Sequence, residues 1–169
     1  MGRMDDDIQI RRLTPQDAAL FRDLRLEALE CSPEGFASTL EAERTRPVEG
    51  FAERLASSAV FVAFDGKTPL GMAGFRAHGG AKMAHKGMLW GMYVRPEARG
   101  RAVGRRLVEA LLAYAAAEVE IVQLAVTTDN APARRLYASL GFVEYGVERR
   151  SLKHAGRYWD DVLMAKDLA

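Results

Sequence analysis

Arg95-Pro96-Glu97-Ala98-Arg99-Gly100-Arg101-Ala102-Val103-Gly104-Arg105-Arg106 joins two apolar segments whose patterns differ. Residues 86–94, before it, are rich in aromatic and long apolar side chains, which predicts a buried strand. After it, apolar side chains recur at steps of three and four, which predicts a helix from about 103 to 118. The loop is suited to hold an anion, because glycines let a ligand approach the backbone and the first N–H groups of a helix lack acceptors.

The spacing of the glycines excludes two common anion-binding loops. The loop contains no G-x-x-x-x-G-K-[ST], the pattern of a nucleoside triphosphate P-loop, and no G-x-G-x-x-G, the pattern of a dinucleotide site. A solvated basic turn stays open as an alternative, because short glycine patterns also match by chance.

The composition is that of a globular domain. The chain has 169 residues, of which 49% are hydrophobic and 28% charged. We expect one domain over residues 8–168 and a frayed acidic lead-in over residues 1–7. The net charge of +1 gives no reason to expect a nucleic-acid partner. No apolar run approaches the ~20 residues of a membrane span, and the lone Cys31 fits a reducing compartment. Three further expectations follow. They are no nucleic-acid partner, no membrane partner and a cytoplasmic location; no metal site is predicted.

Along the chain, strands and helices alternate. Strands are predicted at residues 8–13, 59–64, 70–77, 86–94, 121–126, 142–150 and 158–166, and helices at about 15–31, 36–44, 47–57, 103–118 and 131–140. Gly91 within its strand predicts a bulge or a close approach by another chain or ligand. This order predicts an α/β fold, with a mixed, twisted sheet and helices on both faces.

A second motif runs from Asp129 to Phe142 and reads Asp-Asn-Ala-Pro-Ala-Arg-Arg-Leu-Tyr-Ala-Ser-Leu-Gly-Phe. On residue chemistry alone it is a helix capped by Asn130 and ended by Gly141. Its pattern N-x-x-A-x-x-L-Y-x-x-x-G-F resembles the C-terminal motif of the GNAT superfamily of N-acetyltransferases. The stretch 99–104 resembles, in the expected order, the [Q/R]-x-x-G-x-[G/A] pyrophosphate loop of that family. The resemblance covers roughly residues 8–168 and is strongest over 86–145.

The resemblance implies the GNAT fold and acetyl-CoA as cosubstrate. It implies direct transfer of the acetyl group, in a ternary complex, to the amine of a small molecule, amino acid or peptide. We expect a homodimer, because homodimers are common in the family. Tyr137 is implied as the general acid that protonates the departing thiolate. The implied cofactor-binding residues are Met92, Tyr93 and Val94 for the pantetheine arm, Arg99, Gly100, Arg101, Ala102, Val103, Gly104 and Arg105 for the pyrophosphate, and Asn130.

The loop departs from the family pattern at Ala102, where the first motif glycine usually stands. If that position needs a positive φ, the methyl group costs roughly 1 kcal/mol or more. If the residue is already helical, the methyl group costs little.

The general base and the acceptor are not identified by the sequence. Strand 86–94 carries no carboxylate, although many relatives place a glutamate base there. Glu34, His78, His85 and Asp161 are candidates, and each can equally be a surface or structural polar residue. A non-catalytic acyl-CoA-binding sensor or regulatory module therefore stays open as an alternative. Residues 30–43, the 78–86 loop and the C-terminal hairpin are expected to select the acceptor.

Overall fold

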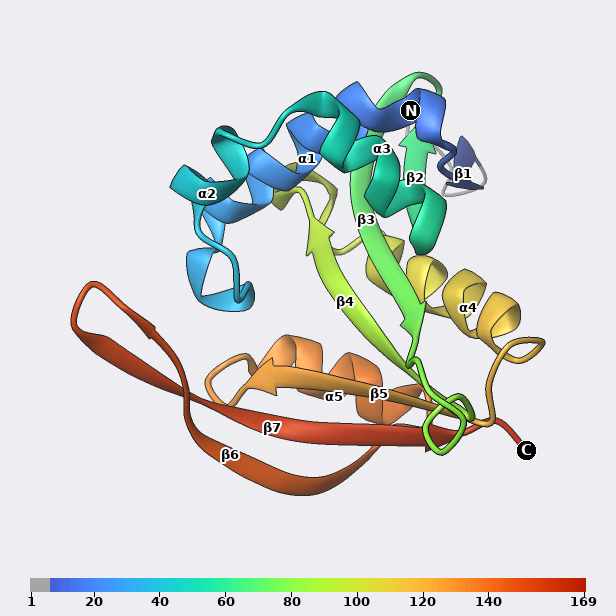
Figure 1. Ribbon diagram of the computed structural model, residues 1–169, viewed down its shortest axis with the longest axis vertical. Helices are drawn as coiled ribbons and strands as arrows, with labels where there is room; N and C mark the ends of the chain where they lie inside the picture. Colours follow the sequence, from blue (N-terminus) through green and yellow to red (C-terminus); the bar gives the residue numbers. More distant parts are fainter. Residues whose placement is uncertain (1–6) are drawn as a thin grey trace.

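The computed structural model describes residues 7–169 (Figure 1). Residues 1–6 of the predicted lead-in lie outside this range. The strands form a seven-stranded sheet in the order β1-β2-β3-β4-β5-β7-β6. They are β1 (Ile8–Arg12), β2 (Ala59–Asp65), β3 (Thr68–Ala77), β4 (Lys86–Val94), β5 (Ile121–Thr127), β6 (Val143–His154) and β7 (Arg157–Asp167). Only β4 and β5 are parallel neighbours in this described sheet, so the predicted mixed sheet is confirmed.

The helices lie close to their predicted positions. They are α1 (Ala18–Cys31), α2 (Leu40–Arg44), α3 (Val48–Ser57), α4 (Val103–Ala115) and α5 (Ala131–Ser139), with single 3₁₀ turns η2 (Pro15–Asp17), η3 (Pro33–Gly35) and η4 (Pro96–Ala98). Two predicted starts were too early. The helix expected from Pro15 first makes a 3₁₀ turn, in which the Asp17 amide donates to the Thr14 carbonyl at 2.8 Å. The helix expected from Phe36 begins at Leu40, because the Thr39 hydroxyl accepts from the Ala42 amide at 3.2 Å and caps it there.

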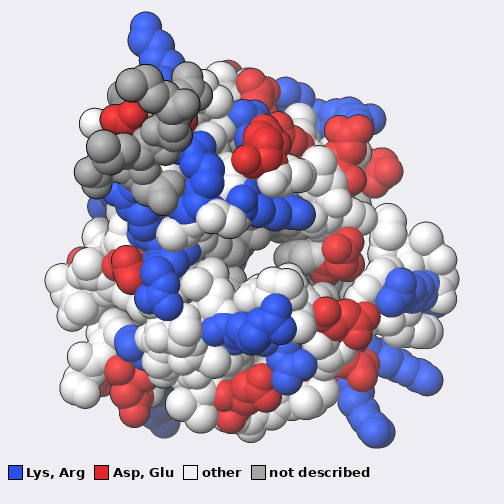
Figure 2. Space-filling model, turned by 180° about the vertical axis from the view of Figure 1, so that it is seen from behind, with Lys and Arg blue, Asp and Glu red and all other residues white. Residues whose placement is uncertain are grey.

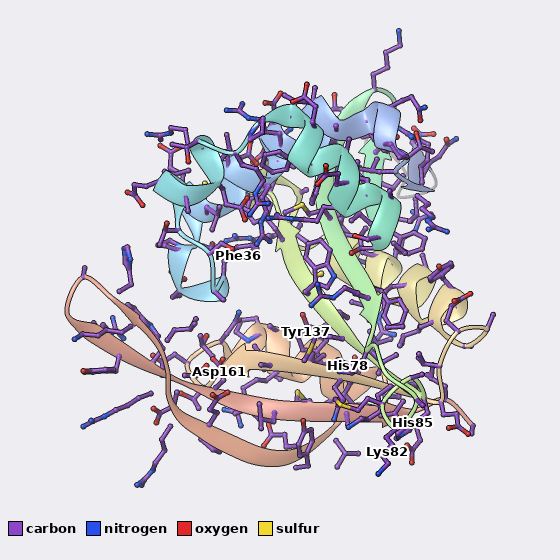
Figure 3. The ribbon with its side chains drawn as sticks, in the orientation of Figure 1. Phe36, His78, Lys82, His85, Tyr137 and Asp161 are labelled. Atoms are coloured by element: carbon purple, nitrogen blue, oxygen red, sulfur yellow. The ribbon has the colours of Figure 1, made fainter. Side chains whose placement is uncertain are left out.

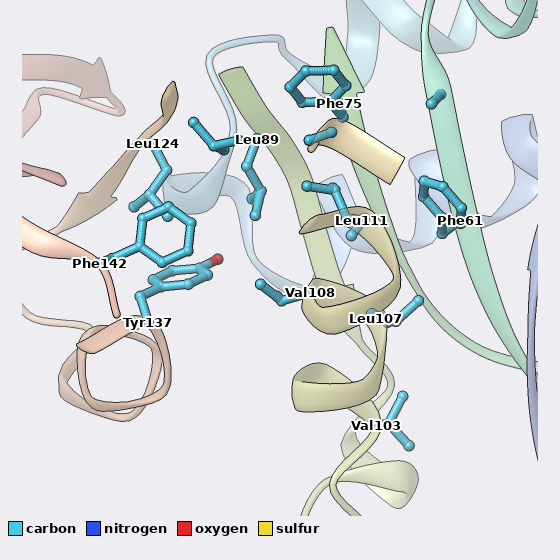
Figure 4. Close-up of a cluster of buried hydrophobic side chains, with 14 of the residues drawn as sticks. Phe61, Phe75, Leu89, Val103, Leu107, Val108, Leu111, Leu124, Tyr137 and Phe142 are labelled. Atoms are coloured by element: carbon cyan, nitrogen blue, oxygen red, sulfur yellow. The ribbon is translucent and has the colours of Figure 1, made fainter. Parts of the chain in front are cut away.

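Helices cover both faces of the sheet, as predicted (Figure 1). Central strands are therefore buried on both sides, which explains their unbroken apolar runs. In β2, for example, Val62 belongs to one core cluster and its neighbour Phe61 to the other. The cluster under α1 and α3 includes Phe21, Leu24, Phe51, Leu55 and Met72. The cluster under α4 and α5 includes Phe75, Leu107, Leu111, Leu124 and Phe142 (Figure 4).

The parallel pair β4 and β5 is joined over a short length. Pairing covers Lys86 with Ile121, Gly87 with Val122 and Met88 with Gln123. Beyond these residues the two strands diverge, which is visible in Figure 1 as an open V between the yellow-green and orange arrows. The edge of β4 that faces β5 is consequently unpaired from Leu89 to Val94 within the described sheet.

A β-bulge bends β4 at this unpaired edge. Met72 of β3 pairs with Tyr93, and Gly74 pairs with Trp90. Two residues of β4 therefore lie opposite one residue of β3, and the first of the two, Gly91, has a φ of +65°. Glycine is suited to this position because it adopts positive φ without steric cost. The bulge that Gly91 predicted is confirmed.

The loop that leads into α4 contains two left-handed residues. Gly100 has a φ of +82°, and Ala102, the residue before α4, has a φ of +57°. For an L-residue with a Cβ, the left-handed region is less stable than the right-handed region by about 1–2 kcal/mol. Of the two alternatives for Ala102, the structure therefore shows the costly one.

Ala102→Gly is expected to raise the free energy of unfolding by about 0.5–1 kcal/mol. Glycine removes the strained Cβ, but it also raises the conformational entropy of the unfolded chain. The net gain in stability is therefore smaller than the strain energy that is removed. Urea denaturation measures it. Ala19→Gly on the exposed side of α1 is the control, and should lower the stability by about 0.5–1 kcal/mol. An Ala102→Gly protein no more stable than wild type would mean that the methyl group is not strained.

Candidate active site

Beyond their three paired residues the strands β4 and β5 diverge, and the space-filling view shows a hollow in the middle of the molecule, here called the cleft (Figure 2). Figure 3 shows Phe36 on one side of it, Tyr137 and Asp161 on the other, and His78 and His85 near the end where the strands meet. A pocket of about 220 Å³, here called the hairpin pocket, lies between the segment after α1 and the β6–β7 hairpin. It is lined by Leu29, Glu30, Pro33, Glu34, Phe36, Ala37, Ser38, Thr39, Leu40, Glu41, Leu152, Lys153, His154 and Trp159.

The loop from β4 to α4 offers backbone N–H groups at the open end of β4. The first backbone hydrogen bond of α4 runs from the Arg106 amide to the Ala102 carbonyl at 3.1 Å. The amides of Val103, Gly104 and Arg105 precede it and have no carbonyl one turn back in the helix. They point out of the helix start, where the helix dipole is positive, so this end of the cleft can accept an anionic group.

The arginine side chains of this loop mostly contact protein. Arg95 donates to both carboxylate oxygens of Glu27 at 2.9 Å, and Arg101 donates to Asp65 at 3.4 Å. Arg105 donates to Glu109 at 3.3 Å and to the Ser139 hydroxyl at 2.8 Å, and the Arg99 Nε donates to the Val94 carbonyl at 3.2 Å. These bonds hold the loop to its neighbours, so the amides are the better placed donors for an anion.

Gly104 is required for close packing inside the protein. A Cβ at this position would lie 3.1 Å from Met92 Cε and 3.2 Å from Leu136 Cδ2. The missing side chain therefore lets α4 approach β4 and α5. The place of Gly104 in the pyrophosphate loop stays a prediction, and the structure adds that the position packs against these two side chains.

The three predicted residues of β4 differ in their surroundings. Met92 and Val94 are half-buried and pack against the core under α4, whereas Tyr93 is buried under α1. The Tyr93 hydroxyl has no hydrogen-bond partner among the described residues. Burial, and then the neighbouring Cys31 and Glu27, raise the pKa of Tyr93 above its ordinary value. The side chain of Tyr93 is thus part of the core, and its backbone lies at the cleft.

Tyr137 lies on α5 with its ring in the core. The ring packs edge-to-face on Phe142, with centroids 5.7 Å apart. In Figure 4 the hydroxyl points away from the α5 backbone, toward the side on which Leu89 and Val108 lie. Burial raises the pKa of Tyr137 well above its ordinary value, so the phenol stays protonated at any physiological pH.

Asn130 caps α5, as predicted. Its Oδ1 accepts a hydrogen bond from the Ala133 amide at 3.2 Å. This bond orients the start of α5, and α5 in turn positions Tyr137.

The four candidate bases are not brought together. Glu34 lines the hairpin pocket, while His78 and His85 lie in the β3–β4 loop, where β4 and β5 meet (Figure 3). Asp161 lies on β7 opposite Thr127 of β5, is buried, and accepts a hydrogen bond from the Ser151 hydroxyl. Asp161 is therefore the candidate that combines burial with a position beside β5.

Sequence reasoning missed a buried charged cluster next to the cleft. Arg25 of α1 and Glu43 of α2 are both buried, and Arg46 and Arg54 also contact Glu43. The pattern held a signal, because Arg25 lies four residues from both Phe21 and Leu29 and therefore shares their inward face. Burial lowers the pKa of Arg25 to about 10.

Two features are absent from the part of the chain that the structure describes. None of the helices within residues 7–169 has the length and apolar character needed to cross a membrane. In the same range, no three His, Cys, Asp or Glu side chains are grouped so that they could hold a metal ion.

Two curated relatives match part of the chain. N-alpha-acetyltransferase RimI of Mycobacterium tuberculosis is 44% identical over 63 residues, which are 37% of this chain and 39% of RimI. Phosphinothricin N-acetyltransferase of Streptomyces coelicolor is 36% identical over 70 residues, which are 41% of either chain. The chain thus matches about two fifths of the length of these relatives.

Solved structures share nearly the whole fold. A GNAT-family acetyltransferase from Streptococcus pneumoniae has a TM-score of 0.81 at 24% identity, covering 96% of this chain and 99% of the other. The acetyltransferase yncA from Salmonella typhimurium, solved with acetyl-CoA, has a TM-score of 0.81 at 21% identity, covering 96% and 95%. The model of the acetyltransferase (GNAT) family matches residues 21–142, and the chain belongs to that family.

Proposed function

We propose that this protein is an N-acetyltransferase that moves the acetyl group of acetyl-CoA directly to an amine. The observation that carries the proposal is the unpaired edge of β4 running into the left-handed loop at the start of α4. An extended amide-containing arm can pair with such an edge, and a pyrophosphate can bind the amides that follow it.

The cosubstrate-binding residues lie along this edge and loop. Backbone groups of Met92, Tyr93 and Val94 would bind the pantetheine arm. The amides of residues 99–105 would bind the pyrophosphate. Arg99 and Arg101 would add charge near the phosphates while keeping their protein contacts. Asn130 acts indirectly, through the start of α5.

Tyr137 is proposed as the general acid. The neutral amine nitrogen bonds to the acetyl carbonyl carbon, the C–S bond breaks, and the sulfur takes the proton of the Tyr137 hydroxyl. The amine then loses one proton, and the phenolate regains one from solvent or through a base. The products are an amide and CoA with its thiol protonated. Burial keeps the phenol protonated before the step.

The proton of the amine has several possible acceptors. Asp161 is buried beside β5, and Glu34 lines the hairpin pocket. We propose Asp161, acting through water, as the first residue to test, since it alone of the four is a buried carboxylate beside β5.

The relatives named above are an N-alpha-acetyltransferase and a phosphinothricin N-acetyltransferase, so both peptide N-termini and small amino compounds are candidate acceptors for this chain. A non-catalytic acyl-CoA sensor is the second candidate, because β4 carries no carboxylate. Release of CoA in the presence of an amine panel distinguishes a transferase from a sensor.

A cytoplasmic location and a homodimer stay predictions. The edge strand β6 supports the dimer, since Val143, Tyr145 and Val147 are exposed by 68%, 56% and 58%. Apolar side chains on an open strand edge favour pairing with another chain.

Saturating acetyl-CoA or CoA is expected to raise the melting temperature by several degrees, because it binds only the folded chain. ATP and NAD should have little effect.

Gly100→Ala should reduce the shift in melting temperature that acetyl-CoA causes, whereas Gly80→Ala should keep it. Both glycines have a similar positive φ, +82° and +88°, and nothing within 4 Å of an added Cβ. Equal shifts with all four ligands would leave only a generic anion site.

Tyr137→Phe is expected to lower kcat at least ~10-fold while leaving the acetyl-CoA affinity and the melting temperature nearly unchanged. The substitution keeps the ring and its packing on Phe142 and removes the proton donor. Steady-state rates with an accepted amine provide the measurement. Tyr145→Phe, on the exposed strand β6, is the control and should match wild type. An unchanged kcat, where chemistry limits turnover, would make Tyr137 a core residue only.

A further inference from the structure

The guanidinium group of Arg25 is buried without a full set of partners. Its side chain is 8% exposed, and its Nε and Nη1 form no hydrogen bond within residues 7–169. Its nearest carboxylate oxygen is Glu43 Oε1, 3.7 Å from Nε. A buried cation with free donors is costly, so a site of this kind calls for an anionic partner.

Glu43 is already bound to another arginine. Arg54 donates two hydrogen bonds to Glu43 Oε1, at 3.2 and 3.1 Å, and Arg46 Nε lies 3.4 Å from Oε2. One carboxylate therefore faces three arginines, and Arg25 is the one held by the longest contact. The cluster has an excess of positive charge, and it is least compensated at Arg25.

Arg25 lies beside the bulge of β4. A Cβ on Gly91 would be 3.3 Å from Arg25 Nη1. The guanidinium carbon is 4.8 Å from the ring centre of Phe36 and 5.7 Å from that of Trp90. Aromatic rings that stack on the faces of a guanidinium leave its edge of N–H groups for a planar anion.

The hairpin pocket is lined by residues that adjoin this arginine. Leu29, one helical turn after Arg25, lines the pocket, and so does Phe36, on which Arg25 stacks. An acceptor bound in the pocket would contact Phe36, the residue on which Arg25 stacks. The next residues of β4, 92–94, are those proposed above to hold the cosubstrate.

We propose that Arg25 binds the carboxylate of the acceptor, and that the acceptor is an α-amino acid. This inference rests on the proposed acetyl transfer. A guanidinium binds a carboxylate through two parallel N–H···O bonds, which fixes both position and orientation. In an α-amino acid the amine is on the carbon that carries the carboxylate, so the bound carboxylate places the amine beside the bulge. The N-terminus of a peptide has no such carboxylate.

The test compares each of a panel of α-amino acids with its α-amide, using the full chain and acetyl-CoA. Wild type should acetylate its best amino acid with a kcat/KM at least about 10-fold above that of the amide, mainly through KM. Arg25→Met should lose this preference, and Arg25→Lys should keep only part of it, because lysine lacks the planar fork. Arg46→Met removes a charge from the same cluster at a 44% exposed side chain, and should keep the preference.

Arg25→Met leaves Glu43 bound to Arg54. If acetyl-CoA raises the melting temperature of this variant as much as that of wild type, the variant is folded. Equal rates for acids and amides in wild type, or an undiminished preference in Arg25→Met, would overturn the inference while leaving acetyl transfer intact.

A second measurement separates the inference from the proposed function. N-acetyl amino acids and their amides are titrated calorimetrically into the protein with CoA bound. Binding that needs the carboxylate and is lost in Arg25→Met supports the anion site even if no amine is acetylated. Absence of both turnover and carboxylate-dependent binding refutes the inference.

Discussion

The limited pairing of β4 with β5 is the constraint on which the site depends. Three residue pairs join the strands, and the bulge at Gly91 then bends β4 away from β5. The two halves of the sheet keep their own helices and their own antiparallel partners, so the sheet opens without losing its core. The opening leaves backbone groups of β4 free beside the start of α4, with Arg25 of α1 next to the bulge at Gly91.

The groups left to bind an anion around this cleft are not the ones that the arginine-rich sequence of the loop before α4 indicates. The arginines that make the loop look basic mostly bind protein groups, as Arg95 does with Glu27. The backbone amides at the start of α4 are left as donors. Arg25, a buried arginine with unused donors among the described residues, lies on another helix and carries no motif. In the proposed complex, anion binding on the cosubstrate side would thus rely on main chain, and on the acceptor side it would rely on one buried side chain.

The fold was predictable from sequence because each element carries local signals. Unbroken apolar runs marked central strands, and Asn130 with Gly141 marked the limits of α5. The family came from two motifs in order. The φ of Ala102 and the packing of Gly104 depend on neighbours distant in sequence, such as Leu136, and no local pattern contains them. The same holds for the Arg25 cluster, whose charges come from α1, α2, α3 and the segment between α2 and α3. The roles of Tyr137 and the loop stay predictions.

The unpaired edge of β4 also bears on how long the protein persists in a cell. Proteases degrade a domain chiefly from its open or unfolded forms, and their population falls as a ligand binds the folded form. With the cosubstrate paired along β4 as proposed, each turnover empties and refills the edge of the sheet. The lifetime of the protein would then follow the supply of acetyl-CoA, and the enzyme would become scarcer when its cosubstrate does.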